Sequence, residues 1–456
     1  MVNSKQIMNY IKLVSLSNFN LWDVKIYNNV KLSFKFNTVI LGNILNSIKT
    51  DWVDIKDNEY YPILGIKGQG KGVYINRISK GSELTMKRYQ KSKSFHLFYC
   101  KVRTVGGQWG VVYPEFEDSY GSSNMQYLKI DLEKITPEYI ELLLKIKKLT
   151  DDWDKNAIGA DGRHFTLNTL LNLQIPLPKL EEQKRIVSSY NKKLQLAQQQ
   201  EEKAKTLETE IEKYLFEELG VQKNYEKKSN NLLQFVSYIK INEWGTDKIF
   251  NLSKIKSLMY EMTSLELKPN YIKSVFRGKS PKYSNNSNKT ILNQKCNRWN
   301  KIELEHSKTV EEKWFNSIDN DFLTKEGDVI INSTGEGTIG RATYLTKENE
   351  GLLYDSHLLL LRVNKDFIDP LFYTYLFNSS FGQNQVNGIK SAQTTKQTEL
   401  GVNNLKKIIF PNMPIEKQKQ ISNHINSIKT QIKELNVLSA TNKEEAIVEF
   451  EKEIFN

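Results

Sequence analysis

Two long stretches of the chain repeat apolar residues in alternating steps of three and four. They cover residues 181–219 and 416–456, and neither contains glycine or proline. The repeating positions are Val187, Tyr190, Leu194 and Ile211 in the first stretch, and Ile421, Ile425, Ile428, Ile432 and Leu435 in the second. This period predicts two helices, each with a narrow apolar seam of the coiled-coil type. At about 1.5 Å per residue, each helix would be roughly 55–60 Å long.

Helices of that length with so narrow a seam need a partner that covers the seam. Because both seams belong to one chain, we expect the two helices to pack against each other in antiparallel orientation. An ordinary homodimeric coiled coil, in which the helices pair with those of a second chain, is the alternative.

The segments that lead into the two helices resemble each other. Residues 175–186 read IPLPKLEEQKRI and residues 410–421 read FPNMPIEKQKQI. Further upstream, YLKIDLEKITPEYI resembles LLRVNKDFIDPLFY, with Pro137 opposite Pro370, and Trp22 has a counterpart in Trp244. Several matches in the same order indicate an internal tandem repeat of about 220–235 residues.

Each copy has the same layout. Short β-like runs separated by Gly, Asn and Ser come first, then a loop with proline, then the long helix. We therefore expect an α+β fold with a pseudo-twofold relation between two mixed α/β domains that are joined by the helices. The expected segments are globular at residues 1–178 and 221–411 and helical at residues 179–220 and 412–456.

The charge balance favours an anionic partner. The formal net charge is +12 and the sequence pI is about 9.2, which favours nucleic acid or an anionic membrane surface. Two widely separated cysteines fit a reducing compartment better than a disulfide framework. No apolar run is long enough to span a membrane, and no signal sequence is visible, so we expect a cytoplasmic protein with no membrane partner.

Motifs for catalysis are weak or missing. GIKGQGKG, residues 65–72, and GEGTIGRA, residues 335–342, have the glycine spacing of a phosphate-binding loop but lack its hydroxyl residue. The five histidines are scattered, so we expect no metal site, and no serine-nucleophile elbow or adenine-methylating loop is found. We expect no catalytic residue, although a two-metal nuclease site need not show in spacing.

Several segments of the chain resemble one protein family, the specificity subunits of type I restriction–modification systems. The resemblance lies in the two helix junctions, in GDVIINSTGEGTIGRATYL (residues 327–345), and in FRGKSPKYS and LNQKCNRWN of the second copy. It covers essentially the whole chain, and GGQWGVVYPEF (residues 106–116) is a more divergent part of it.

The resemblance implies that each globular segment is a target-recognition domain. Residues 1–178 and 221–411 would each read one half of a split double-stranded DNA target. The helices at residues 179–220 and 412–456 would act as spacers. It further implies that two methyltransferase subunits dock on the helices and bring S-adenosylmethionine, so that this chain holds no cofactor. Restriction subunits would join that complex.

The candidate DNA contacts are polar and basic residues on glycine-rich loops and near aromatic residues. They are Lys67, Gln69, Lys71, Arg77, Arg88, Arg103, Gln108, Arg277, Lys279, Lys282, Arg298, Ser333, Thr334, Thr338 and Arg341. Backbone amides in residues 67–71 and 333–341 are expected to approach phosphate, and Trp299 is expected in the core.

Two other functions stay open: a self-contained DNA-modifying or cutting enzyme with an unrecognised active site, and a coiled-coil scaffold of a defence complex.

Overall fold

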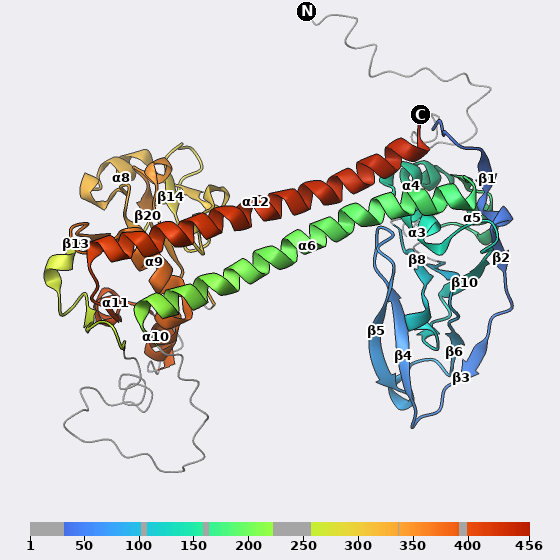
Figure 1. The fold of residues 1–456 in the computed structure, drawn as a ribbon, viewed down its shortest axis with the longest axis horizontal. Helices are drawn as coiled ribbons and strands as arrows, with labels where there is room; N and C mark the ends of the chain where they lie inside the picture. Colours follow the sequence, from blue (N-terminus) through green and yellow to red (C-terminus); the bar gives the residue numbers. More distant parts are fainter. Residues whose placement is uncertain (1–31, 102–106, 158–163, 222–256, 336, 392–398) are drawn as a thin grey trace, which may run out of the picture. The chain divides into compact units, whose positions relative to one another are not determined.

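The computed structural model describes residues 32–101, 107–157, 164–221, 257–335, 337–391 and 399–456 (Figure 1). The chain divides into two compact units. Unit 1 comprises residues 1–200 and 437–456, and unit 2 comprises residues 201–436. Each unit therefore contains half of each long helix together with one globular part.

The central sheet of unit 1 has four strands in the order β2-β10-β7-β8. The strands are β2 (Leu45–Ser47), β10 (Met125–Ile130), β7 (His96–Cys100) and β8 (Trp109–Val112). The helices that follow are α3 (Pro137–Lys145), α4 (Lys147–Trp153) and α5 (Leu167–Leu171), and β1 (Thr38–Ile40) pairs with β11 (Gln174–Pro176) just before the long helix.

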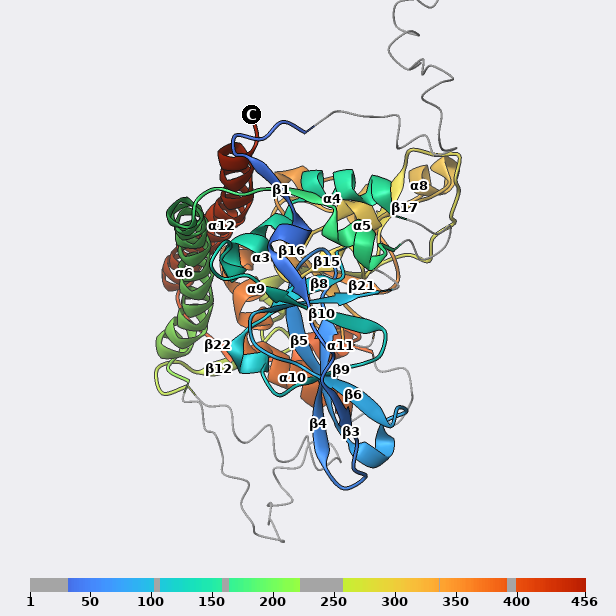
Figure 2. The same cartoon turned by 90° about the vertical axis from the view of Figure 1, so that its right-hand side faces the viewer.

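Unit 1 also has a five-stranded sheet in the order β3-β6-β9-β4-β5. Its strands are β3 (Trp52–Asp54), β6 (Arg88–Lys91), β9 (Tyr120–Gly121), β4 (Tyr60–Ile66) and β5 (Val73–Lys80). Figures 1 and 2 both show β3, β4 and β6 at the end of unit 1 that lies away from the long helices.

The central sheet of unit 2 has the equivalent strand order, β13-β21-β18-β19. The strands are β13 (Ile272–Arg277), β21 (Leu358–Val363), β18 (Val329–Asn332) and β19 (Ala342–Tyr344). The helices that follow are α9 (Pro370–Asn378), α10 (Ser380–Ser391) and α11 (Val402–Lys407), and β12 (Met262–Ser264) pairs with β22 (Ile409–Pro411). Because the same elements recur in the same order, the predicted duplication is confirmed.

The units differ in what is inserted into this common frame. In place of the five-stranded sheet, unit 2 has β14 (Thr290–Leu292), β15 (Asn297–Arg298), β16 (Lys301–Ile302), β17 (Lys308–Thr309), α8 (Glu312–Asn316) and β20 (Leu353–Tyr354). These form a three-stranded sheet, β17-β14-β20, and the two-stranded β15-β16.

The repeated prolines begin matching helices. Pro137 and Pro370 are the first residues of α3 and α9, where the missing N–H costs nothing because no partner exists for it. The preceding residues, Thr136 and Asp369, cap the helices by accepting hydrogen bonds from the amides of Tyr139 and Phe372.

The two long helices are α6 (Leu180–Leu219) and α12 (Ile415–Ile454). Each begins one residue before the predicted glutamate, and in each unit the two helices pack in antiparallel orientation, as predicted. In unit 1, Arg185 Nη2 lies 2.7 Å from Glu453 Oε2, and Lys193 Nζ lies 2.6 Å from Glu445 Oε2. In unit 2, Lys417 pairs with Glu218.

Apolar residues fill the space between the helices. In unit 1, Val187 and Tyr190 pack with Phe450 in the main core. In unit 2, Ile428 and Ile432 form a buried cluster with Ala204, and Ile211 and Leu435 pack against it. Ile421 and Ile425 are fully buried in the globular core that also contains Leu215 and Leu219. Leu194 is half-buried.

A buried glutamine fastens each helix to its globular part. Gln183 Oε1 accepts a hydrogen bond from Thr136 N at 2.8 Å, and its Nε2 donates to Lys134 O and Pro178 O at 2.9 Å each. Gln418 bonds in the same way to Asp369 N at 3.0 Å and to Phe367 O and Met413 O at 2.9 Å each. The repeated glutamine of the two junction motifs therefore has the same structural role in both copies.

Candidate nucleic-acid interface

One edge of the central sheet in unit 2 is rich in polar side chains. β13 ends at Arg277 and β18 at Asn332, while β21 follows His357 and β19 follows Arg341. Arg277 and Ile331 both lie opposite Leu359, and Ile331 lies opposite Ala342, so these strand ends meet at the same edge. We call Arg277, Ser333, Thr334, Arg341 and His357 the polar edge of unit 2.

The loop of residues 333–341 is fixed to this edge by buried amides. Asn297 Nδ2 donates to Asn332 Oδ1 and to Arg341 O, both at 2.9 Å, and Gln383 Nε2 donates to Gly340 O at 2.8 Å. Gly335, Gly337 and Gly340 have φ angles of +103°, +72° and +82°, a backbone conformation that residues with a side chain rarely adopt. The described part of the loop is therefore held in shape before any ligand binds.

Most amides of this loop already have partners within the protein. Ser333 N donates to His357 O, Thr338 N to Gly335 O and Gly340 N to Asn332 O. Turn hydrogen bonds use these three N–H groups, so the predicted approach to phosphate would depend on other amides of the loop and on side chains.

Three predicted contacts of the loop lie near His357. Thr334 Oγ1 lies 2.6 Å from His357 Nδ1, and the buried Ser333 Oγ donates to Leu400 O at 3.0 Å. Thr338 Oγ1 donates to Thr334 O at 3.2 Å. Thr334 and Thr338 are half-buried, so only part of each side chain is open to a ligand.

The two arginines of the polar edge are held differently. Arg277 pairs with Glu399, and its Nε donates to Ser356 O at 3.0 Å. Arg341 Nη2 donates to Gly337 O at 3.3 Å, and its guanidinium lies 6.0 Å from the ring centre of Trp299. The Trp299 side chain was expected in the core, but it is 45% exposed because β15 and β16 place it at the surface of their short turn.

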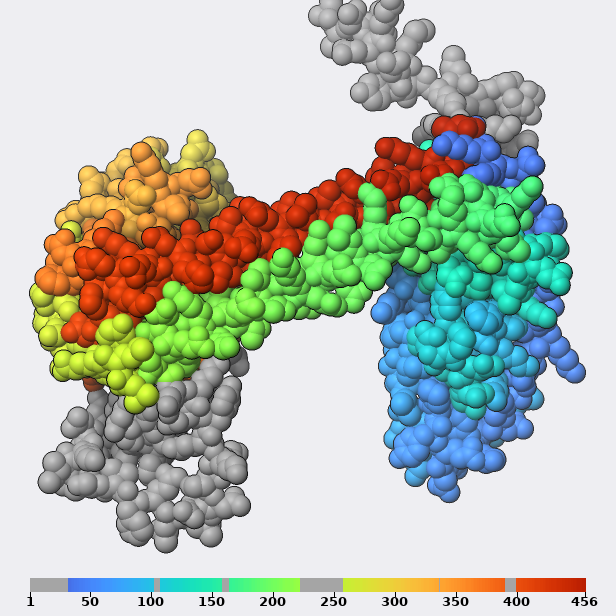
Figure 3. Space-filling model, viewed as in Figure 1, coloured from blue at the N-terminus to red at the C-terminus, as the bar shows by residue number. Residues whose placement is uncertain are grey.

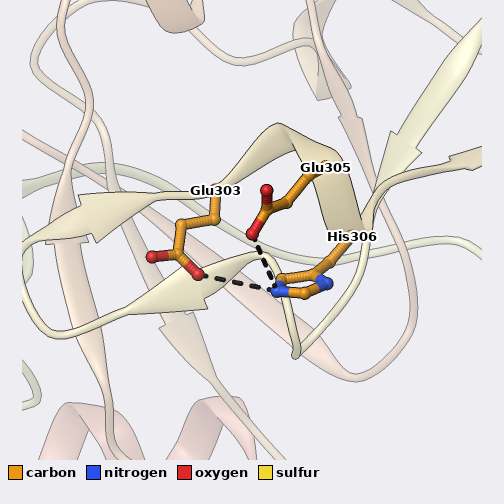
Figure 4. Close-up of side chains that lie close together, drawn as sticks. All are labelled: Glu303, Glu305 and His306. Carbon is orange, nitrogen blue, oxygen red and sulfur yellow. Dashed lines mark ion pairs between the residues drawn. The ribbon is translucent and has the colours of Figure 1, made fainter. Parts of the chain in front are cut away.

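Glu303, Glu305 and His306 form a charged cluster (Figure 4), and Arg298 pairs with its Glu303. Arg298 Nε donates to Glu303 Oε2 at 2.9 Å, and its Nη2 lies 3.2 Å from His306 Nε2. Hydrogen bonds from Arg298 and then Lys301 lower the pKa of Glu303. The two carboxylates and the imidazole lie close enough to share a cation. In this arrangement, however, the cationic guanidinium of Arg298 already pairs with Glu303 and lies beside His306.

The remaining predicted lysines of unit 2 follow β13. Lys279 Nζ lies 3.9 Å from the ring centre of Phe322, which covers one side of the ammonium group. Lys282 is exposed, and its backbone carbonyl accepts from Glu311 N at 2.9 Å.

In unit 1, Gln108 directly precedes β8 of the central sheet, and three further predicted contacts lie on a loop of the five-stranded sheet that reaches the same segment. The β4–β5 loop carries Lys67, Gln69 and Lys71, all exposed, and Gln69 adopts φ +62°. Gly70 N donates to Gly107 O at 2.9 Å, which brings the loop beside Gln108 at the start of β8. The amides of Lys67 and Gly70 are thus bonded within the protein and do not face a ligand.

The other predicted arginines of unit 1 lie elsewhere. Arg77 is exposed on β5, and Arg88 is exposed on β6 with its Nε 3.7 Å from Asp54 Oδ1. Arg103 lies outside the described residues.

One known protein family matches part of the chain. Residues 35–209 match the family described as the type I restriction modification DNA specificity domain. Over these residues, which lie in the first half of the chain, the protein is similar to that family.

Two other similar proteins are described as parts of type I restriction systems. A putative type I restriction enzyme MjaX specificity subunit from Methanocaldococcus jannaschii is 32% identical over 118 residues, which are 24% of this chain and 28% of that protein. The match thus spans little more than a quarter of that relative's length. A chain from a structure described as the basis of complex assembly and conformational transition of the type I R-M system has a TM-score of 0.57 at 15% identity, covering 93% of this chain and 97% of that one.

A more distant likeness is the crystal structure of the HsdS subunit from Thermoanaerobacter tengcongensis. Its TM-score is 0.47 at 16% identity, and the alignment covers 93% of this chain and 98% of that one.

Sequence reasoning about the polar edge of unit 2 missed His357, Gln294 and Glu399. Thr334 contacts the first two, and Arg277 pairs with the third. His357 could have been found, because it directly precedes the apolar run that predicts β21. Glu399 follows a polar stretch without periodicity, so no local signal marks it.

No helix among the described residues is long and apolar enough to cross a membrane.

Proposed function

We propose that the chain is the sequence-specific DNA-binding subunit of a type I restriction–modification complex. Each unit would read one half of a bipartite duplex through the polar edge of its central sheet. The observation that carries the proposal is the repeated sheet, whose same edge bears polar and basic loops in both copies. Polar side chains on shaped loops are suited to base edges, and exposed lysines are suited to phosphates.

The two half-targets should differ in sequence. The frame is shared, but the residues around the edge are not: unit 1 has the β4–β5 loop beside Gln108, whereas unit 2 has residues 333–341 beside Arg277. Because base recognition depends on the placement of a few side chains, different loops select different bases.

We further propose that the methylation and cleavage of DNA are carried out by partner subunits. Methyltransferase subunits, two in number, would bring S-adenosylmethionine, and restriction subunits would add cleavage, so this chain itself needs no cofactor, metal or catalytic residue. The complex would act in the cytoplasm, where its DNA target lies.

A surface on the helices is suited to docking such a subunit. Val437, Leu438, Ile447 and Val448 of α12 have side chains 58%, 49%, 45% and 41% exposed, and Leu196 of α6 is 45% exposed. We call these residues the outer stripe. Figure 3 shows α6 (green) and α12 (red) side by side in unit 1. Exposed apolar residues of this kind favour contact with another protein.

The test is selection of DNA from a random duplex library by the full chain, alone and assembled with a cognate methyltransferase. We expect one split motif with two conserved halves, the same in both selections. Methylated-base sequencing of cells that carry both genes should return the same motif. Methyl transfer by this chain without a partner would instead support the self-contained enzyme. Binding without a preferred motif would support the scaffold.

A further inference from the structure

Glu399 links two parts of the polar edge of unit 2. Its Oε1 forms an ion pair with Nη1 of Arg277, the last residue of β13. The same oxygen lies 3.3 Å from Oγ of the buried Ser333, whose single hydroxyl hydrogen is shared between this oxygen and Leu400 O at 3.0 Å. One carboxylate therefore holds both the arginine and the start of the loop that follows β18.

The backbone beside Glu399 is itself anchored. Leu400 N donates to Ser333 O at 2.8 Å, and Ser333 Oγ donates to Leu400 O at 3.0 Å. Leu400 and Ser333 are almost completely buried, at 1% and 0% exposed. The position of the carboxylate is thus determined by the fold, unlike that of an acid on a loose surface loop.

The guanidinium of Arg277 is held at two of its three nitrogens. Nη1 pairs with Glu399, and Nε donates to Ser356 O, while Nη2 has no hydrogen bond among the described residues. The side chains of Arg277 and Glu399 are 45% and 34% exposed, so the pair is open to a ligand. An arginine carries five N–H groups, so donors remain for a base after these contacts.

We propose that Glu399 is a specificity-determining residue that acts by positioning Arg277, an inference that rests on the proposed function. An arginine can bind either a base edge or a phosphate, and a phosphate contact carries no sequence information. The carboxylate beside Arg277 repels phosphate and orients the guanidinium, so that its remaining N–H groups point to a base edge. The planar guanidinium can donate two parallel hydrogen bonds, and guanine is the base that presents two acceptors in the major groove.

The test is Glu399→Gln in the full chain, with binding to the selected duplex and to a scrambled duplex measured by fluorescence anisotropy. Glutamine keeps the size and the acceptor for Ser333 but removes the charge. We expect tighter binding to the scrambled duplex and weaker discrimination at one base pair of the second half-site. The salt dependence should steepen by about one phosphate contact, which is roughly a threefold larger loss of affinity between 50 and 200 mM salt.

The double variant separates positioning from a structural role. In an Arg277→Ala background, Glu399→Gln should change neither discrimination nor salt dependence, because the residue it positions is gone. An effect of equal size in both backgrounds would overturn the proposal. Glu218→Gln is the matched control, because Glu218 pairs with Lys417 on the helices and has a similarly shielded side chain, 27% exposed; it should leave both quantities unchanged.

A further variant keeps the test decisive if Glu399→Gln does not fold. Arg277→Lys retains the charge but lacks the planar fork, so discrimination at the same base pair should fall while the salt dependence stays nearly constant. Unchanged discrimination in both Arg277→Lys and Arg277→Ala would overturn the inference. A chain with no preferred duplex at all would instead contradict the proposed function, so the two failures are distinguishable.

Discussion

Lysine and arginine contact DNA in different ways, and both occur among the predicted contacts. Lys71 lies exposed on the β4–β5 loop, and the structure gives its side chain no partner among the described residues. Arg341 sits beside Trp299 with one hydrogen bond to Gly337 O. Lysine acts as a point charge for phosphate, whereas the arginine fork can read guanine.

Lys71→Ala should therefore weaken binding to all duplexes alike and reduce the salt slope by about one unit. Arg341→Lys should instead relax one base position, at a cost of about 1–3 kcal/mol in discrimination. Competition binding over a set of single-base variants measures both effects. Lys192→Ala, at an exposed position on α6, is the control. If Lys71→Ala altered the preferred bases, its assignment to phosphate would be wrong.

The buried glutamines give a second prediction for single residues. Gln418→Ala removes three hydrogen bonds and leaves the amide of Asp369 without its partner. Unpaired buried groups are costly, so we expect the free energy of unfolding to fall by about 2–4 kcal/mol. Urea unfolding measures the loss, and Gln199→Ala at an exposed position on α6 should show almost none. A loss of similar size in both variants would exclude the fastening role.

At the scale of elements, the two sides of α12 should respond differently to charge. Ile428 is 8% exposed in a cluster with Ala204 and Ile432, whereas Val437 of the outer stripe is 58% exposed. The same substitution by glutamate thus tests packing at one position and docking at the other.

Ile428→Glu places a carboxylate among apolar side chains, and we expect a loss of roughly 3–5 kcal/mol in the free energy of unfolding. Val437→Glu should leave unfolding unchanged but prevent assembly with a methyltransferase subunit. Urea unfolding and size-exclusion chromatography of the mixed subunits measure the two outcomes. Normal assembly of Val437→Glu would show that the outer stripe is not the docking surface.

The elements predicted from the sequence are those whose signal is local. The three–four spacing through Ile428 and Ile432 marks α12, and the repeated junction motif marks the start of both long helices. The five-stranded sheet could not be predicted, because β9 has two residues and its pairing joins Ile63 to Tyr120 across a segment that contains β5, β6, β7 and β8. The pair of Arg277 and Glu399 is hidden for the same reason: it depends on tertiary contact, which no local pattern records.

For the whole molecule, the duplication makes modularity testable. Each unit has its own central sheet and its own main core. Replacing residues 1–178 with the matching part of a relative should therefore change one half of the DNA target only. Methylated-base sequencing reads both halves at once. A change in both halves together would contradict independent reading.

Continuous helices link the two units and suggest what sets the distance between the half-targets. The boundary between the units falls at Gln200 in α6 and at Asn436 in α12, and each helix continues through it as a single element of 40 residues. One added heptad lengthens a helix by about 10 Å and keeps the apolar seam in phase. Because Gln200 Oε1 accepts from Asn442 Nδ2 at 3.0 Å, insertions after Gln199 and after Asn442 lie at the same level.

We expect the double insertion to lengthen the spacer of the target by roughly three base pairs, at about 3.4 Å per base pair. That change also rotates one half-site by about 100° around the duplex, so affinity should fall even while the preferred spacing grows. The spacer in methylated sites is therefore the quantity to measure, with the single insertion after Gln199 as the control, since it shifts one seam against the other. An unchanged spacer in an active double-insertion protein would show that something other than the helices sets the gap.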